Sequence, residues 1–86
     1  MYYVYVLRSD VDKMLYTGCT DNLRKRFRRH NEGRVPATHR RVPLALVYYE
    51  ACLSIDDAYR REKYLKTSYG KRYLKSRLRS YFKLSP

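Results

Sequence analysis

The sequence holds few of the residues that would support a disulfide framework, a zinc site or a membrane anchor. Its two cysteines, Cys19 and Cys52, lie far apart and outside any C-x-x-C or Cys/His ligand pattern, so we expect two reduced thiols. No apolar run approaches the ~20 residues of a spanning helix, and residues 1–10 are too short and too polar for a signal peptide. We therefore expect a soluble, cytoplasmic protein with no membrane segment and no obligate protein partner.

Acidic residues are also scarce, with 8 Asp and Glu against 20 Lys and Arg in 86 residues, which gives a formal net charge of +12. A chain of this length is expected to form one domain, residues 1–86, with a single modest core. So much positive charge causes self-repulsion unless the working partner is a polyanion. Nucleic acid is the leading candidate. An anionic membrane surface and an acidic protein partner are less specific alternatives.

Three segments have the composition of strands. Residues 2–8 alternate β-branched and aromatic side chains, which predicts a strand covered on both faces. A five-residue loop of turn formers leads to a second short strand at 14–18, and the resulting hairpin brings Tyr5 and Tyr16 near each other. The continuous apolar run at 44–50 predicts a third, buried strand.

The first of three helical segments follows the hairpin directly. A turn at residues 18–21 precedes it, and Gly18 is expected to permit that tight turn. Thr20 or Asp21 is expected to cap the free amides at the start of the helix. Gly33 is expected to end the helix.

The other two helical segments lie in the last third of the chain. Ser54 and Asp57 fit the S-x-x-D form of a capping box, which predicts a second helix running to about residue 68. Gly70 breaks the pattern. A third helix is then predicted from residue 71 to about residue 82.

The first helix has an apolar face that includes two polar side chains. Leu23, Arg26, Phe27 and His30 share an arc of roughly 100°. An inward Arg26 is costly to desolvate unless a carboxylate or a bound phosphate meets it. The opposite face is basic and predicts a track for phosphates. With the basic loop that follows, this face supplies the candidate nucleic-acid contacts Arg24, Lys25, Arg28, Arg29, Arg40 and Arg41.

The second helix places one carboxylate, Glu62, in the middle of its apolar face. The other members of that face are Ile55, Ala58, Leu65 and Tyr69. A buried salt bridge between Arg26 and Glu62 would explain both charges without catalysis, and the strand tyrosines would then be core aromatics. Alternatively, a phosphodiesterase could use an arginine to neutralise phosphate, a carboxylate to hold Mg²⁺ or Mn²⁺, and a phenol or imidazole to position water.

The residues that decide between these interpretations also resemble a known family. Tyr3-Val4-Tyr5, a hairpin of about ten residues, Tyr16-Thr17-Gly18 and the run G-x-T-x-x-L-x-x-R-x-x-x-H are similar to the GIY-YIG nuclease domain. The R-E-K segment at residues 61–63 is similar to that of the family's small single-domain members, which are themselves similar to the nuclease module of an excinuclease. The resemblance covers nearly the whole chain.

This resemblance implies an α/β (α+β) fold in which about three helices flank a small three-stranded antiparallel sheet, in the order β-β-α-β-α-α. It also implies a metal-dependent endonuclease that hydrolyses DNA, with Mg²⁺ or Mn²⁺ as cofactor. By position, Tyr5 and Tyr16 would activate and order the attacking water, and Arg26 would grip the scissile phosphate. His30 would assist proton transfer, and Glu62 would ligate the metal.

Three positions depart from the family pattern, and they leave one alternative open. Tyr3 replaces the Gly and Val4 the Ile of the first name motif, and Thr17 replaces the Ile of the second. The chemical residues are intact, although Thr17 puts a polar group where an apolar one is expected. No second domain is visible that could choose the DNA, so selectivity is expected to be weak or based on DNA structure. The alternative is a non-catalytic module that binds DNA or structured RNA.

Overall fold

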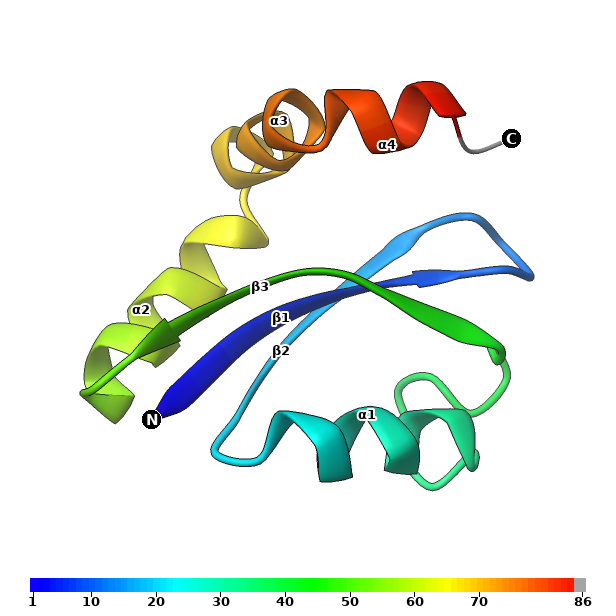
Figure 1. The fold of residues 1–86 in the computed structure, drawn as a ribbon, viewed down its shortest axis with the longest axis horizontal. Helices are drawn as coiled ribbons and strands as arrows, with labels where there is room; N and C mark the ends of the chain where they lie inside the picture. Colours follow the sequence, from blue (N-terminus) through cyan, green and yellow to red (C-terminus); the bar gives the residue numbers. More distant parts are fainter. Residues whose placement is uncertain (85–86) are drawn as a thin grey trace.

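The computed structural model of the chain describes residues 1–84, which form three strands and four helices (Figure 1). The predicted α+β class and the antiparallel sheet are confirmed. In chain order the elements are β1 (Tyr2–Ser9), β2 (Leu15–Thr20), α1 (Leu23–Asn31), β3 (Leu44–Cys52), α2 (Ile55–Leu65), α3 (Ser68–Arg77) and α4 (Arg79–Leu84). The predicted single helix from 71 to about 82 is wrong, because the helical path is interrupted at Leu78, whose backbone leaves the helical region at φ −107° and ψ 22°.

The sheet has the strand order β2-β1-β3, and both pairs are antiparallel. The central strand is β1, and Val4 and Val6 are completely buried, which confirms the prediction of a strand covered on both faces. The edge strand β3 leaves Tyr49 54% exposed. The prediction of a buried third strand is therefore wrong, since an apolar run does not reveal whether its strand lies at the centre or at the edge of a sheet.

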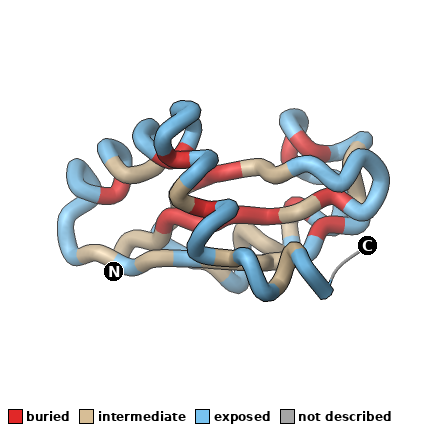
Figure 2. Tube along the Cα trace, turned by 90° about the horizontal axis from the view of Figure 1, so that it is seen from above, coloured by how far each residue is buried: buried red, intermediate tan, exposed pale blue. Residues whose placement is uncertain are grey.

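Each face of the sheet carries its own small core. Tyr5 and Leu7 pack on α1 with Leu23 and Phe27. On the other face, Val4, Val6, Ala58, Leu65 and Leu74 form a second core against α2 and α3. Figure 1 shows α1 on one side of the sheet and α3 and α4 on the other, and Figure 2 shows buried segments following the sheet between exposed helix surfaces. Alternating strand residues thus divide the apolar side chains between two layers.

Gly70 does not break a helix, contrary to the prediction. It lies in the first turn of α3 and is buried, and a Cβ there would overlap the carbonyl oxygen of Tyr64 and the backbone of Leu65. The helix α2 ends at Leu65, and Thr67 caps α3 by accepting a hydrogen bond from the Gly70 amide at 3.1 Å. Gly70 therefore allows the end of α2 and the start of α3 to come into backbone contact.

The predicted inward face of the second helix is only partly correct. Ala58 and Leu65 are buried, but Ile55 is 38% exposed and Tyr69 is 68% exposed. Tyr69 lies beyond the chain reversal, in α3, so the periodicity of α2 no longer applies to it. None of the helices within residues 1–84 is long and apolar enough to cross a membrane.

Candidate active site

A buried chain of hydrogen bonds links the centre of the sheet to α1 and the loop after it. The Tyr5 hydroxyl lies 2.8 Å from Nε2 of His30, and Nδ1 of His30 lies 2.7 Å from Oγ1 of Thr38. Tyr5 is 1% exposed, and His30 and Thr38 are completely buried. The sequence pattern did not identify Thr38, which lies in a basic loop without period. Its role depends on a partner that only the tertiary structure supplies.

Arg26 contacts the same phenol from the outer side. Its Nε donates a hydrogen bond to the Tyr5 hydroxyl at 3.4 Å, and its side chain is partly buried. The salt bridge considered between Arg26 and Glu62 is not formed, because Glu62 pairs with Lys66 at 3.0 Å. Within residues 1–84, no carboxylate pairs with Arg26. A partly desolvated guanidinium without a counter-anion is suited to bind phosphate.

The electrostatics of this cluster keep Tyr5 protonated and His30 neutral at neutral pH. Burial raises the pKa of Tyr5, and nearby Tyr16 and Glu62 act in the same direction, whereas the Arg26 hydrogen bond opposes them. Burial and then the charge of Arg26 lower the pKa of His30 to about 4. Since Arg26 only donates, the Tyr5 oxygen accepts from it and can direct its own proton to Nε2 of His30. His30 then positions Tyr5.

The second tyrosine lies beside this cluster. The Tyr16 ring centroid is 5.2 Å from that of His30 and 6.5 Å from that of Tyr5, with edge-to-face and tilted geometry respectively. Tyr16 is partly exposed, and within residues 1–84 its hydroxyl takes part in no hydrogen bond. The predicted approach of Tyr5 and Tyr16 is confirmed. Of the two phenols, Tyr16 is the one available to bind water.

Gly18 serves this cluster in a way that the sequence pattern did not predict. It lies within β2 directly opposite Tyr5, so the predicted tight turn at residues 18–21 is wrong. A Cβ at Gly18 would overlap the hydroxyl-bearing end of the Tyr5 ring. The helix α1 is capped by Asn22, whose side chain accepts from the Lys25 amide at 3.1 Å, and not by Thr20 or Asp21. The predicted end at Gly33 agrees with the structure, where Gly33 follows the C-cap with φ +75°.

The helices α1 and α2 meet at the edge of the sheet formed by β2. A groove of about 330 Å³ at this edge is lined by Arg26 from α1 and by Ile55 and Tyr59 from α2. Glu62 lies one turn after Tyr59 on the same side of α2. Its charge raises the pKa of Tyr5 and of Cys19, another lining residue of the groove, so the carboxylate acts on this edge of the sheet.

The structure offers Glu62 as a single carboxylate ligand for a divalent metal. Within residues 1–84, no group of three or more His, Cys, Asp or Glu side chains could hold an ion. Mg²⁺ commonly binds through one or two carboxylates and completes its shell with water and substrate phosphate. The Glu62 side chain is 20% exposed and its Lys66 partner 54% exposed, so an ion could displace this lysine. The donor set fits a metal that is bound together with substrate.

Five of the six candidate phosphate contacts are accessible. Arg24, Lys25, Arg28 and Arg40 are exposed and Arg29 is partly exposed. Arg41 instead forms a salt bridge with Asp12 at 2.7 Å and donates to the Met14 carbonyl at 3.1 Å, which lowers the pKa of Asp12. The structure therefore gives Arg41 a role in holding the hairpin loop, while the phosphate contacts of the other five stay a prediction.

Arg61, in the R-E-K segment, has a structural role. Its guanidinium forms a two-point pair with Glu50, with contacts of 2.9 to 3.1 Å, and lies 4.8 Å from the ring centroid of Tyr73 and 5.2 Å from that of Tyr64. Glu50 also accepts a hydrogen bond from Tyr48 at 2.9 Å. This network fastens α2 to β3 and fixes the helix that carries Glu62.

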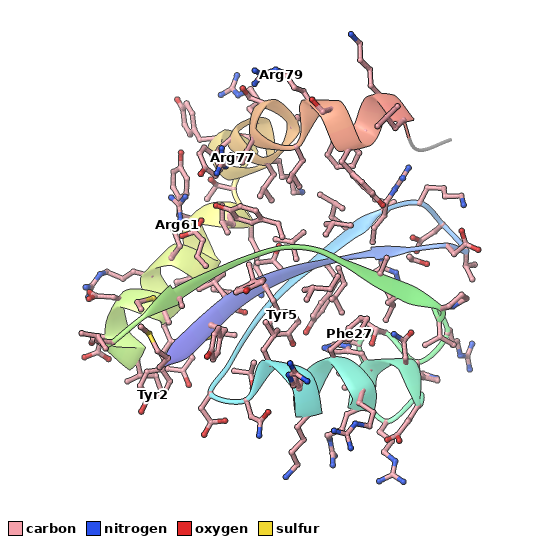
Figure 3. All side chains as sticks on the ribbon, viewed as in Figure 1. Tyr2, Tyr5, Phe27, Arg61, Arg77 and Arg79 are labelled. Carbon is pink, nitrogen blue, oxygen red and sulfur yellow. The ribbon has the colours of Figure 1, made fainter. Side chains whose placement is uncertain are left out.

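Figure 3 shows Tyr5 and Phe27 between the sheet and α1, and Arg61 on the side of α2 that faces away from α1. The sequence profile of the GIY-YIG catalytic domain matches residues 1–77. The chain belongs to the GIY-YIG family. The resemblance predicted from its tyrosines, Gly18, Arg26 and His30 is thus confirmed. GIY-YIG domains are generally endonuclease domains that use a divalent metal.

The relatives that this GIY-YIG domain resembles carry names that state no activity. It is 45% identical over 67 residues to a UPF0213 protein of Clostridium perfringens, a match that spans 77% of this chain and 71% of the relative. A UPF0213 protein of Streptococcus pyogenes is 51% identical over 49 residues, which is 52% of its length. The solution structure of a UPF0213 protein from Bacillus halodurans matches at 34% identity with a TM-score of 0.55, covering 88% of this chain and 84% of that one.

Proposed function

We propose that this GIY-YIG domain is a divalent-metal-dependent endonuclease that hydrolyses phosphodiester bonds in DNA, with weak or structure-based selectivity. The observation that supports the proposal is Arg26. Its partly buried guanidinium contacts the Tyr5 phenol, has no carboxylate partner within residues 1–84, and lines a groove at the β2 edge. A phosphate is the ligand whose charge and geometry complete this site.

Each residue of the site then has a separate task. Arg26 binds the scissile phosphate and stabilises the charge that develops on it. Tyr16 donates to and orients the attacking water, because its hydroxyl is available. Tyr5 holds Arg26 in register with that water, and His30, which is neutral and completely buried, holds Tyr5. His30 is a positioning residue in this assignment, since its Nε2 is already occupied by Tyr5.

Glu62 is the residue that would hold the metal. When bound, a divalent ion supplies charge neutralisation and lowers the pKa of water. The side chain of Glu62 belongs to a helix fixed by the Arg61–Glu50 pair, so the carboxylate is carried on a rigid element. The outer arginines of α1 contribute affinity for the DNA backbone without reading bases.

The second candidate function, a non-catalytic nucleic-acid-binding module, is supported by the completeness of the buried network. The hydroxyl of Tyr5 and both ring nitrogens of His30 already have partners, so the cluster is stable without substrate. In such a module Arg26 is one more phosphate contact and Glu62 has no task.

A cleavage screen separates the two candidates. The wild-type chain is incubated with flapped, branched, duplex and single-stranded DNA, and with matched RNA, in Mg²⁺ or Mn²⁺. Removal of one transition-state donor costs about 10²- to 10³-fold in rate, so Arg26→Ala should lose that much cleavage. Arg28→Ala removes an equal charge from the exposed side of α1 and should lose less than about tenfold. Equal losses for the two variants, or no cleavage of any substrate, would contradict the nuclease proposal.

A further inference from the structure

A larger groove than the candidate active site opens between the hairpin and the last two helices. Its volume is about 720 Å³. Its floor is apolar and includes Met14, Leu15 and Phe82. Met14 is 66% exposed, and Figure 1 shows α4 lying above the hairpin that carries it. An apolar floor of this size on a strongly basic protein calls for a ligand with an apolar part.

The rim of this groove is basic. One wall carries a cation at every fourth residue of α3 and α4, namely Lys71, Lys75, Arg79 and Lys83. Within one helix this spacing corresponds to a rise of about 6 Å per step. Among the described residues that line the groove, none is acidic. Excess positive charge around an apolar floor fits a ligand that has regularly spaced anionic groups and flat apolar groups.

The cations on the helical wall are not neutralised within the protein. The salt bridges formed within residues 1–84 involve none of the four. The hairpin wall differs, because Lys13 pairs with Asp10 at 2.6 Å and the guanidinium of Arg8 lies 5.6 Å from the ring centroid of Phe82. The helical wall is therefore the part of the groove that gains most from an anionic ligand.

We infer that this groove binds an unpaired stretch of a nucleic-acid strand, with the helical-wall cations on its phosphates and the apolar floor against its bases. Unpaired bases present flat apolar faces that a duplex keeps inside its stack, and single-strand sites combine a cationic track with apolar or aromatic platforms. The ligand class rests on the proposed function. The groove deepens that function by assigning it substrates with single-stranded segments.

The position of the groove connects it to the candidate active site. Leu15 in the groove floor and Tyr16 in the site are neighbours on β2 and point to opposite faces of that edge strand. A strand that passes over the β2 edge can therefore contact Arg26 on one side and the groove on the other. Such a path places the bond to be cut beside a single-stranded flank.

The test measures binding of a labelled oligothymidylate of about 12 nucleotides, and of a blunt duplex, in EDTA so that no cleavage occurs. Lys71→Ala combined with Lys75→Ala should weaken single-strand binding about tenfold. It should also lower the slope of log affinity against log salt by about 1.4, since each lost single-strand phosphate contact contributes about 0.7. Met14→Ser, at an exposed floor position, should weaken single-strand binding and leave duplex binding unchanged.

A matched control removes the same charge elsewhere. Lys63→Ala combined with Arg77→Ala alters two exposed cations outside the groove and should change single-strand affinity by less than about twofold. Equal losses for the two double variants, or an equal effect of Met14→Ser on duplex and single strand, would overturn the inference. So would displacement of the oligonucleotide by an acidic, leucine-containing peptide or by anionic vesicles that bind the wild type tightly but not the groove variants.

The binding test and the cleavage screen fail separately. If no substrate is cut but the groove variants lose single-strand binding, the proposed nuclease fails and the groove assignment stands. If cleavage depends on Arg26 but the groove variants bind as the wild type does, the groove assignment fails and the nuclease stands.

Discussion

At the scale of single residues, the site is built from side chains whose tasks depend on close neighbours. Arg26 was predicted to face inward and to need an anion, and the structure shows it partly buried against Tyr5 with no carboxylate partner within residues 1–84. Periodicity could place Arg26 because helix geometry is regular. It could not identify Thr38 as the partner of His30, because a loop residue has no period and its partner is distant in space.

The protonation of His30 leads to a pH-dependent prediction. The pKa of His30 is about 4 in the folded chain against an ordinary value of 6.5, so the unfolded chain binds more protons between these values. The stabilisation from neutral His30 is therefore fully present above pH 6.5 and is lost as the pH falls toward 4, by up to about 3 kcal/mol. Urea unfolding of the wild type and of His30→Gln should show their difference in unfolding free energy shrinking by that amount. A constant difference across this range would contradict the buried neutral imidazole.

At the scale of the elements, two glycines were correctly singled out but assigned the wrong tasks. Gly18 and Gly70 were predicted to be a turn residue and a helix breaker, yet one lies in a strand and the other in a helix. Both are needed because another group comes too close for a Cβ. A glycine has the same sequence signature whether it frees the backbone or makes room, so only the tertiary structure separates the two.

Gly70 gives a prediction in which two effects have opposite signs. Helix propensity alone would make Gly70→Ala stabilising by about 1 kcal/mol. The new methyl group, however, would overlap backbone atoms of Tyr64 and Leu65, and overpacking against groups that cannot rotate away costs about 1 to 3 kcal/mol or more. We expect the unfolding free energy to fall. Ser76→Ala, at an exposed position of α3, should change it by less than about 0.5 kcal/mol, and a stabilised Gly70→Ala variant would refute the close contact of α2 with α3.

At the scale of the whole molecule, the fold could be predicted from the sequence more fully than the site. The alternating strands, the hairpin and the basic helix specify the order of the elements, and their pairing follows from short connections. The edge position of β3 and the split between α3 and α4 were not predicted, since both depend on how much of each element is covered. The net charge of +12 remains the most direct property of the surface.

That charge predicts how nucleic-acid binding responds to salt. With about five phosphates neutralised by the exposed cations, raising the salt concentration from 50 to 200 mM should weaken duplex binding by roughly 10²- to 10³-fold. Fluorescence anisotropy with a labelled duplex in EDTA measures this directly. A flat response would mean that the affinity does not come from phosphate contacts and would remove the basic face of α1 from the binding surface.

Glu62 is the residue that most sharply separates a catalytic site from a structural one. Its ion pair with Lys66 is an exposed i, i+4 pair, worth about 0.3 to 0.5 kcal/mol. Glu50 is the matched control, because it is a carboxylate that pairs in two-point geometry with Arg61. Glu50→Gln should lower the unfolding free energy more than Glu62→Gln does, yet cleavage per folded molecule should be retained.

The most direct test is therefore metal-dependent cleavage per folded molecule by the wild type and by Glu62→Gln, with DNA binding and unfolding free energy measured on the same samples. We predict that Glu62→Gln keeps its stability to within about 0.5 kcal/mol, binds DNA as the wild type does, and loses at least about 10²-fold in Mg²⁺-dependent cleavage. Cleavage by Glu62→Gln at the wild-type rate per folded molecule would contradict the proposed metal-dependent nuclease and favour a basic nucleic-acid-binding module in its place.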